Sequence, residues 1–149
     1  MSAIIGLDPG LVATGIASIR GDVCVFAATI RTGLIVDAIK ELSQFQINVP
    51  VAVQVPCRDG QKSPRFHGGG GMSLVRHALF CGEIIGRLRA HGYRVIEVSA
   101  LDCRRAPMKL DAKLWCAAWH WTGTPPSEHA RDAAEIARIG RRMIQEQGT

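Results

Sequence analysis

Several residues of this chain have the types and spacing that metal chemistry requires, and the first of them is Asp8. It ends a short apolar run from Ala3 to Leu7, and Pro9-Gly10 turns the chain immediately afterwards. An ionised carboxylate beside a core strand costs free energy unless another group pairs with it. A bound cation is one such partner, so the segment is a candidate metal-dependent active site. A plain β-turn with Asp in its first position explains the same residues, and both interpretations stay open.

A second group of polar residues lies far from Asp8 in the sequence. Gln54 comes near the end of a β-branched run over 49–55, and His129 precedes Asp132 by three positions. That spacing places His129 and Asp132 on one helical face, near a helix N-terminus whose dipole favours anions. We expect Asp8, Gln54, His129 and Asp132 to converge on one edge of the sheet. Taken singly, each also fits an ordinary strand, surface or helix-dipole role.

The elements that must position these residues alternate in type. Hydrophobic patterns predict strands over 3–7, 14–19, 23–29, 49–55 and 93–98, and helices over 34–45, 73–90, 111–120 and 127–145. A Gly/Asp turn joins the second and third strands, so the first three are predicted to be antiparallel. The fold class is therefore α/β, with a central mixed five-stranded sheet flanked by helices. Ser127, after Pro125-Pro126, is the predicted N-cap of the last helix.

Composition limits the kind of protein further. The 149 residues fit a single domain over 1–149, and the net charge of +5 favours a polyanionic partner. No apolar run approaches the roughly 18 residues of a membrane span, which argues against a membrane protein. The five cysteines are scattered without a C-x-x-C pair, which is typical of reduced thiols in a cytoplasmic protein.

Three motifs together resemble one family. The opening I-I-G-L-D-P-G with T-G-I-A-S-I, the strand V-A-V-Q-V-P and the closing H-A-R-D-A-A resemble the RuvC-like Holliday junction resolvases of the ribonuclease H-like superfamily. The resemblance covers essentially the whole chain in order. The small size and the E-H-A-R-D-A form suggest a phage or prophage branch.

This resemblance implies a ribonuclease H-like fold and a homodimeric endonuclease that cuts four-way DNA junctions. The family's metal ligands carry over onto Asp8, His129 and Asp132. Two divalent ions per site, Mg²⁺ or Mn²⁺, would supply the hydrolytic chemistry, with no small-molecule cofactor. His129 has a residue type that suits either metal ligation or proton transfer.

One position departs from the family pattern. Where the family has a glutamate ligand, this chain has Gln54, which is neutral and offers one carbonyl oxygen. The loss of one ligand charge weakens a Mg²⁺ site and should reduce hydrolysis severely while leaving DNA binding intact. Two alternatives to an active resolvase stay open. One is a catalytically silent branched-DNA-binding protein, natural or engineered, and the other is a different ribonuclease H-like nuclease.

DNA contacts are expected outside the acidic site. The glycine-rich stretch over 57–71 and the region around Asp111 carry side chains suited to phosphates, and Phe66 could stack on an opened base. The residues predicted to bind DNA are Arg58, Lys62, Arg65, Phe66, Lys109 and Lys113. The run Gly68 to Gly71 is more simply a hinge than a phosphate cradle, since no G-K-[ST] follows it.

Symmetric cutting of a two-fold junction requires a two-fold protein, so we expect an isologous homodimer. Trp115 and Trp119 lie four residues apart, on one face of a predicted helix. That spacing favours packing in the core. The same face, or the helix over 73–90, is the candidate dimer contact.

Overall fold

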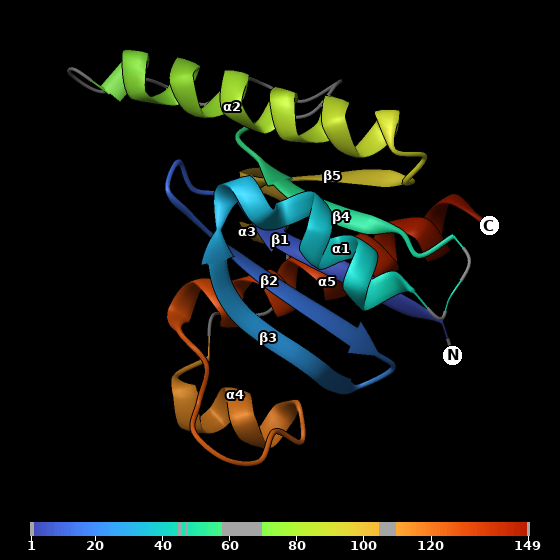
Figure 1. Cartoon of the computed structure of the whole chain (residues 1–149). Helices are drawn as coiled ribbons and strands as arrows, with labels where there is room; N and C mark the ends of the chain where they lie inside the picture. Colours follow the sequence, from blue (N-terminus) through green and yellow to red (C-terminus); the bar gives the residue numbers. More distant parts are fainter. Residues whose placement is uncertain (1, 45, 47, 58–69, 105–109, 149) are drawn as a thin grey trace.

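The computed structural model of the chain describes residues 2–44, 46, 48–57, 70–104 and 110–148. A five-stranded sheet in the order β3-β2-β1-β4-β5 forms its centre (Figure 1). The strands are β1 (Ala3–Asp8), β2 (Ala13–Arg20), β3 (Val23–Arg31), β4 (Val51–Val55) and β5 (Val95–Ser99). β1, β2 and β3 are antiparallel, whereas β4 pairs parallel with both β1 and β5. The predicted mixed sheet is therefore confirmed.

The register of the central strands brings two of the predicted site residues together. Leu7 of β1 is paired with Val53 of β4, so Asp8 and Gln54 follow at neighbouring positions on adjacent parallel strands. Successive side chains of a strand point to opposite faces. Leu7 and Val53 belong to the core on one face, and so Asp8 and Gln54 face the other.

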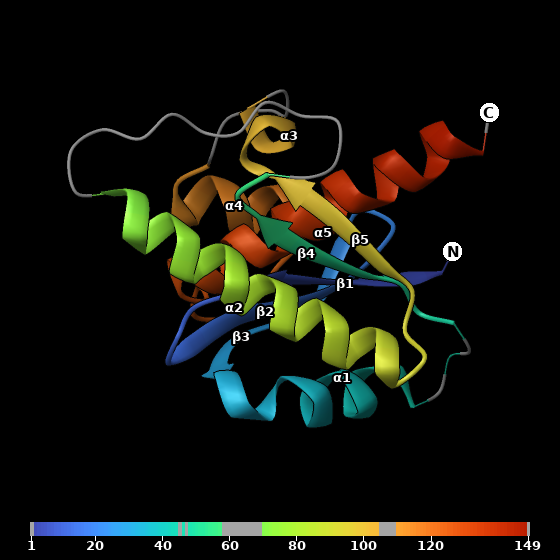
Figure 2. The same cartoon turned by 90° about the horizontal axis from the view of Figure 1, so that it is seen from above.

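Helices cover both faces of the sheet because its central strands are apolar on both sides. On one face, α5 (Glu128–Gln147) packs against β1 and β2, with α4 (Ala112–Ala118) beside it. The other face is covered by α1 (Ile35–Ser43) and α2 (Gly70–Ala90), which lie on the same side of the sheet in Figure 2, and α2 contacts β4 and β5. None of the helices in the described part of the chain has the length and apolar character to cross a membrane.

The ends of the predicted strands and helices differ from the observed ends by at most three residues. One α-helix of the structure was not predicted. A short 3-10 turn (Thr32–Leu34) precedes α1, and α3 (Ala100–Arg104) follows β5 directly. Ser99 begins α3: its Oγ accepts from the backbone N–H of Asp102, and its N–H donates to the Asp102 carboxylate at 2.8 Å. This is a capping box, a pattern that marks helix starts.

The tryptophan face of α4 is buried within the molecule. Trp115 and Trp119 are 1% and 4% exposed, and their rings lie 6.3 Å apart in the core between α4, α5 and the sheet. The packing prediction for these residues is confirmed. The alternative that this face forms a dimer contact is wrong, because the chain's own core already covers both rings.

Candidate active site

A cavity of about 360 Å³ lies where the C-terminal ends of β1 and β4 meet the first turns of α5. Its walls include all of the predicted metal and catalytic residues, Asp8, Gln54, His129 and Asp132. Glu128, considered from the sequence as a substitute for the missing glutamate but not assigned to the site, also lines the cavity. The wall residues that sequence reasoning missed are Cys103, Glu135, Ile136, Arg138 and Ile139. The expected convergence on one sheet edge is therefore observed.

Close contact between α5 and the sheet depends on two glycines. A Cβ atom at Gly15 of β2 would overlap the backbone carbonyl oxygen of His129. A Cβ atom at Gly6 of β1 would overlap the carbonyl oxygen of Ala133. Only glycine permits such an approach of helix backbone to strand backbone. These positions bring the first turns of α5 against the end of β1, where Asp8 lies.

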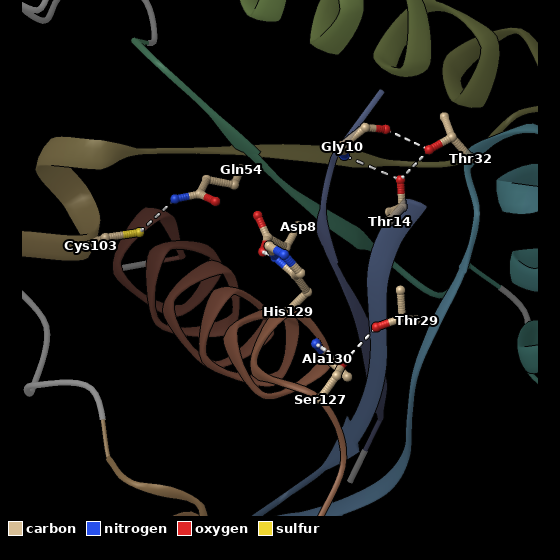
Figure 3. A network of polar contacts seen from close by, with 10 residues as sticks. All are labelled: Asp8, Gly10, Thr14, Thr29, Thr32, Gln54, Cys103, Ser127, His129 and Ala130. Atoms are coloured by element: carbon tan, nitrogen blue, oxygen red, sulfur yellow. Dashed lines mark hydrogen bonds and ion pairs between the residues drawn. The ribbon is translucent and has the colours of Figure 1, made fainter. Parts of the chain in front are cut away.

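Ser127 fixes the start of α5. Its Oγ accepts a hydrogen bond from the backbone N–H of Ala130 at 3.3 Å, which confirms the predicted N-cap. The same oxygen lies 2.5 Å from Oγ1 of Thr29 on β3 (Figure 3). The cap thus joins the helix start to the sheet and holds the turns that carry His129 and Asp132.

Asp8 and His129 are in direct contact. Nδ1 of His129 lies 3.0 Å from Oδ2 of Asp8 (Figure 3). The His129 side chain is 70% exposed, whereas that of Asp8 is 15% exposed. The hydrogen bond to Asp8 and the charge of that carboxylate raise the pKa of His129, against a smaller lowering by burial. The charges of Asp132 and Glu128 raise the pKa further. The site therefore favours the imidazolium form of His129.

The turn that follows Asp8 is held by a small hydroxyl network. Thr32 Oγ1 donates to the carbonyl oxygen of Gly10 at 2.5 Å and lies 3.0 Å from Oγ1 of Thr14. The backbone N–H of Gly10 donates to Thr14 Oγ1 at 3.4 Å (Figure 3). Thr14 is fully buried, so the two bonds of its hydroxyl are partly shielded from water. They fix the chain immediately beyond the site carboxylate.

Gln54 has a defined orientation at the opposite wall. Its Nε2 donates to Sγ of Cys103 on α3 at 4.0 Å, a long contact to a weak acceptor. Figure 3 shows the carbonyl oxygen of the same amide on the side of Asp8. A neutral oxygen therefore stands beside Asp8 where a glutamate would have supplied a charged one.

The donor set of the cavity suits a particular kind of metal site. Among the described residues, no three His, Cys, Asp or Glu side chains come close enough together to hold a metal ion. Asp8 and Asp132 nevertheless supply hard carboxylate oxygens to one cavity. Mg²⁺ is commonly bound through one or two carboxylates together with substrate phosphates. The residues thus fit an ion that completes its coordination with a phosphate-bearing ligand, and the described ones do not form a preformed metal cage.

Most of the predicted DNA-binding residues cannot be placed in the structure. Arg58, Lys62, Arg65, Phe66 and Lys109 lie outside the described residues. Lys113 is exposed on α4, whose first turn is capped by the Asp111 carboxylate accepting from Leu114 N–H at 2.9 Å. Lys113 is not among the described residues that line the cavity.

The strand order, with a carboxylate at the end of β1 and a second on the last helix, defines a ribonuclease H-like fold. The chain has the fold of RuvC. A structure of T. thermophilus RuvC in complex with a Holliday junction substrate matches with a TM-score of 0.66 and 18% identity, over 100% of this chain and 98% of that chain. A second Thermus thermophilus RuvC structure matches with a TM-score of 0.62 and 18% identity, over 99% and 97%. No protein-family model matches the sequence, and a search of curated proteins gave no match.

Proposed function

We propose that this chain is a structure-specific endonuclease that binds four-way DNA junctions and hydrolyses phosphodiester bonds with Mg²⁺ or Mn²⁺. One observation supports this above all. Asp8, Gln54, His129 and Asp132 line one cavity in a fold shared, over nearly the full length of both chains, with a RuvC structure bound to a Holliday junction substrate. The net charge of +5 is consistent with a nucleic acid partner.

Each residue has a distinct part in this proposal. Asp8 and Asp132 hold the metal, and two ions per site remain the number that the family resemblance implies. A bound ion supplies Lewis-acid stabilisation of the phosphate and lowers the pKa of a water. His129 holds a proton at Nδ1 beside Asp8 and is exposed enough to exchange it with solvent or substrate. Gln54 contributes an oxygen without charge, so this wall attracts a cation less strongly than a glutamate wall would.

A second candidate function is junction binding with little or no cleavage. The specific observation that favours it is the Gln54 amide, which directs its nitrogen at Cys103 and leaves the cavity one carboxylate short of the family pattern. Binding of DNA phosphates depends mainly on cationic side chains and would survive that loss. The two candidates therefore differ in the chemical step alone.

A cleavage assay on a labelled four-way junction separates the two candidates. The wild-type chain and Gln54→Glu are incubated with the junction in Mg²⁺ or Mn²⁺, with a linear duplex of the same sequence as the substrate control. We expect paired nicks from the wild-type chain. We expect Gln54→Glu to cut at least about 10- to 100-fold faster, because one added ligand charge stabilises bound metal by a few kcal/mol.

The remaining outcomes of this assay are informative as well. If only Gln54→Glu cuts, the native chain is a silent junction binder. If Gln54→Glu creates no cleavage and Asp8→Asn changes nothing in either background, the metal-site assignment is wrong. A wild-type chain that fails even to shift the junction on a gel contradicts both candidate functions.

The homodimer is part of the same proposal, and α2 is the surface to which we assign it. Val75 and Leu79 lie one turn apart on α2 and are 45% and 70% exposed. An isologous contact between two such helices would bury both side chains. Sedimentation of the chain at micromolar concentration should show a dimer, and Leu79→Glu should shift it toward monomer. A wild-type monomer both with and without junction DNA would contradict the assignment.

A further inference from the structure

Arg138 occupies a special place on the wall of the candidate active site. It lines the cavity that holds Asp8 and Asp132, and it also lines a second cavity of about 290 Å³ beside α4. Glu135 and Arg138 are the wall residues that the two cavities share. The guanidinium therefore lies at the boundary between the acidic site and the neighbouring hollow.

A chain of hydrogen bonds holds this guanidinium in position. Nε and Nη2 of Arg138 donate to Oε2 of Glu135 at 2.9 and 2.6 Å. The other carboxylate oxygen of Glu135 accepts from Nε1 of Trp119 at 2.9 Å. Trp119 is buried in the core, so its indole anchors Glu135, and Glu135 in turn holds Arg138 in place. An isolated pair three residues apart on a helix contributes only a few tenths of a kcal/mol and needs no such anchor.

Glu135 engages two of the three nitrogens of the Arg138 guanidinium. Within the described part of the chain, Nη1 of Arg138 forms no hydrogen bond, whereas Nε and Nη2 are both engaged by Glu135. The side chain is 28% exposed. Arginine is well suited to phosphate because its planar fork keeps its charge and presents several donors. The residue thus combines a fixed position with an available donor.

The charge of the cavity wall makes a positive side chain important for a bound phosphate. Its wall carries four carboxyl groups, those of Asp8, Glu128, Asp132 and Glu135. Carboxylates repel the like charge of a DNA phosphate, so a strand that enters the cavity is favoured where a cationic side chain faces it. Arg138 is the only Lys or Arg among the described residues of that wall. It follows Asp132 by six residues, which is about 9 Å along the helix axis.

We propose that Arg138 binds a DNA phosphate other than the one at Asp8 and Asp132, with Glu135 and Trp119 holding its guanidinium for that contact. This inference rests on the proposed function, because it assumes that a DNA strand enters the cavity. Arg138 then determines how the strand lies across the site, and the second cavity marks the direction in which the strand continues.

Salt dependence of junction binding tests the inference without cleavage. Affinity for a synthetic four-way junction is measured in EDTA over a range of salt concentrations for the wild-type chain, Arg138→Gln and Arg142→Gln. Arg142 is the matched control, since it pairs with Glu146 on the same helix and is absent from the described walls of both cavities. Each phosphate contact adds about 0.9 to the slope of log affinity against log salt.

We expect Arg138→Gln to lower that slope by about 0.9 per bound chain and to weaken binding roughly 5- to 10-fold near 0.1 M salt. Arg142→Gln should keep the wild-type slope, and Arg138→Lys should restore it, because a point charge still meets the phosphate. If Arg138→Gln and Arg142→Gln lowered the slope equally, the effect would come from the loss of one positive charge anywhere on the helix. That result would overturn the inference.

Glu135→Gln separates a phosphate contact from a purely structural ion pair. This variant breaks the pair but leaves the cation, so the slope should stay at the wild-type value. A slope lowered as far as in Arg138→Gln would show that the broken pair is the cause, and the inference would be wrong. If the wild-type chain binds no junction, the proposed function itself fails. If it binds and Arg138→Gln keeps the full slope, only the inference about Arg138 fails.

Discussion

The Nδ1 atom of His129 lies 3.0 Å from Oδ2 of Asp8, although 121 positions separate the two residues in the chain. This contact joins the first turn of the last helix to the end of the first strand. The contact gives Asp8 a partner in the absence of a cation. A carboxylate is therefore tolerated beside a core strand, because His129 offsets the cost of placing it there. Because the neighbouring carboxylates raise the pKa of His129, a measurement of that pKa detects changes in the charge of the site.

Replacement of Asp8 should change the titration of His129. In Asp8→Asn, we expect the pKa of His129 to fall toward its ordinary value of 6.5, because the hydrogen bond and charge that raise it are lost. NMR of the imidazole protons measures this shift directly. Asp37→Asn, which removes an exposed acid from the first turn of α1, is the matched control and should leave the His129 titration unchanged. A wild-type His129 pKa retained in Asp8→Asn would refute the contact.

The same raised pKa sets the sign of a pH effect on stability. A group whose folded pKa is above its unfolded value adds stability that is fully present below the unfolded pKa, and that is lost as pH rises through the folded one. The contribution of His129 should therefore be fully present below about pH 6.5 and be lost as pH rises from there through the raised pKa of the folded protein. Because His129 is largely exposed, the effect is small, and only a comparison of urea unfolding between wild type and His129→Gln will resolve it.

Removal of the N-cap should loosen the helix that carries half of the site. Ser127→Ala leaves the Ala130 N–H without its acceptor and is expected to lower the free energy of unfolding by about 1 kcal/mol. Ser127→Asp keeps a capping oxygen and should retain most of the stability. Urea denaturation of the three proteins measures the difference. Equal losses in both variants would mean that the cap is not what holds this end of α5.

The glycine at position 15 should be irreplaceable for steric reasons. A methyl group there meets the backbone of His129, so Gly15→Ala must push α5 away from β2 and should cost about 1–3 kcal/mol or more. Gly82→Ala on α2 is the control, since nothing lies within 4 Å of its Cβ position and alanine favours a helix by up to about 1 kcal/mol. In thermal unfolding, the melting temperature should fall for Gly15→Ala and rise for Gly82→Ala. A tolerated Gly15→Ala would show that α5 does not approach the sheet this closely.

Much of the fold was accessible from sequence because local patterns determined it. The alternating and continuous apolar runs gave all five strands, and the order of the motifs placed Asp8, Gln54 and the last helix at one edge. The short helix α3 was missed, although its Ser99-x-x-Asp102 capping box is readable in the sequence. A helix of only five residues leaves too few apolar positions to show a period.

The remainder of the cavity wall depends on tertiary placement. Glu135 follows Asp132 by three residues and Arg138 follows Glu135 by three, so each step between neighbours on α5 could be read from the sequence. Their link to Trp119 could not, because it requires α4 to pack against α5 after a turn with no periodic signal. Cys103 reaches the site only because α3 follows β5 without a loop. Local patterns identified the acids, whereas tertiary packing supplied the groups around them.

Metal binding in the absence of DNA should depend on position 54. Of the four carboxyl groups on the cavity wall, we assign only those of Asp8 and Asp132 to the metal, and Asp8 is already engaged by His129. Mg²⁺ or Mn²⁺ alone should therefore barely change the melting temperature of the wild-type chain. Gln54→Glu adds a charged oxygen on the strand next to Asp8, and metal at tenfold its Kd should then stabilise the fold by about 1.4 kcal/mol. Gln145→Glu, which adds the same charge at the exposed end of α5, is the control. If all three proteins respond alike to metal in a thermal unfolding assay, Gln54 does not face the metal position, and the reduced charge of this site has no bearing on its chemistry.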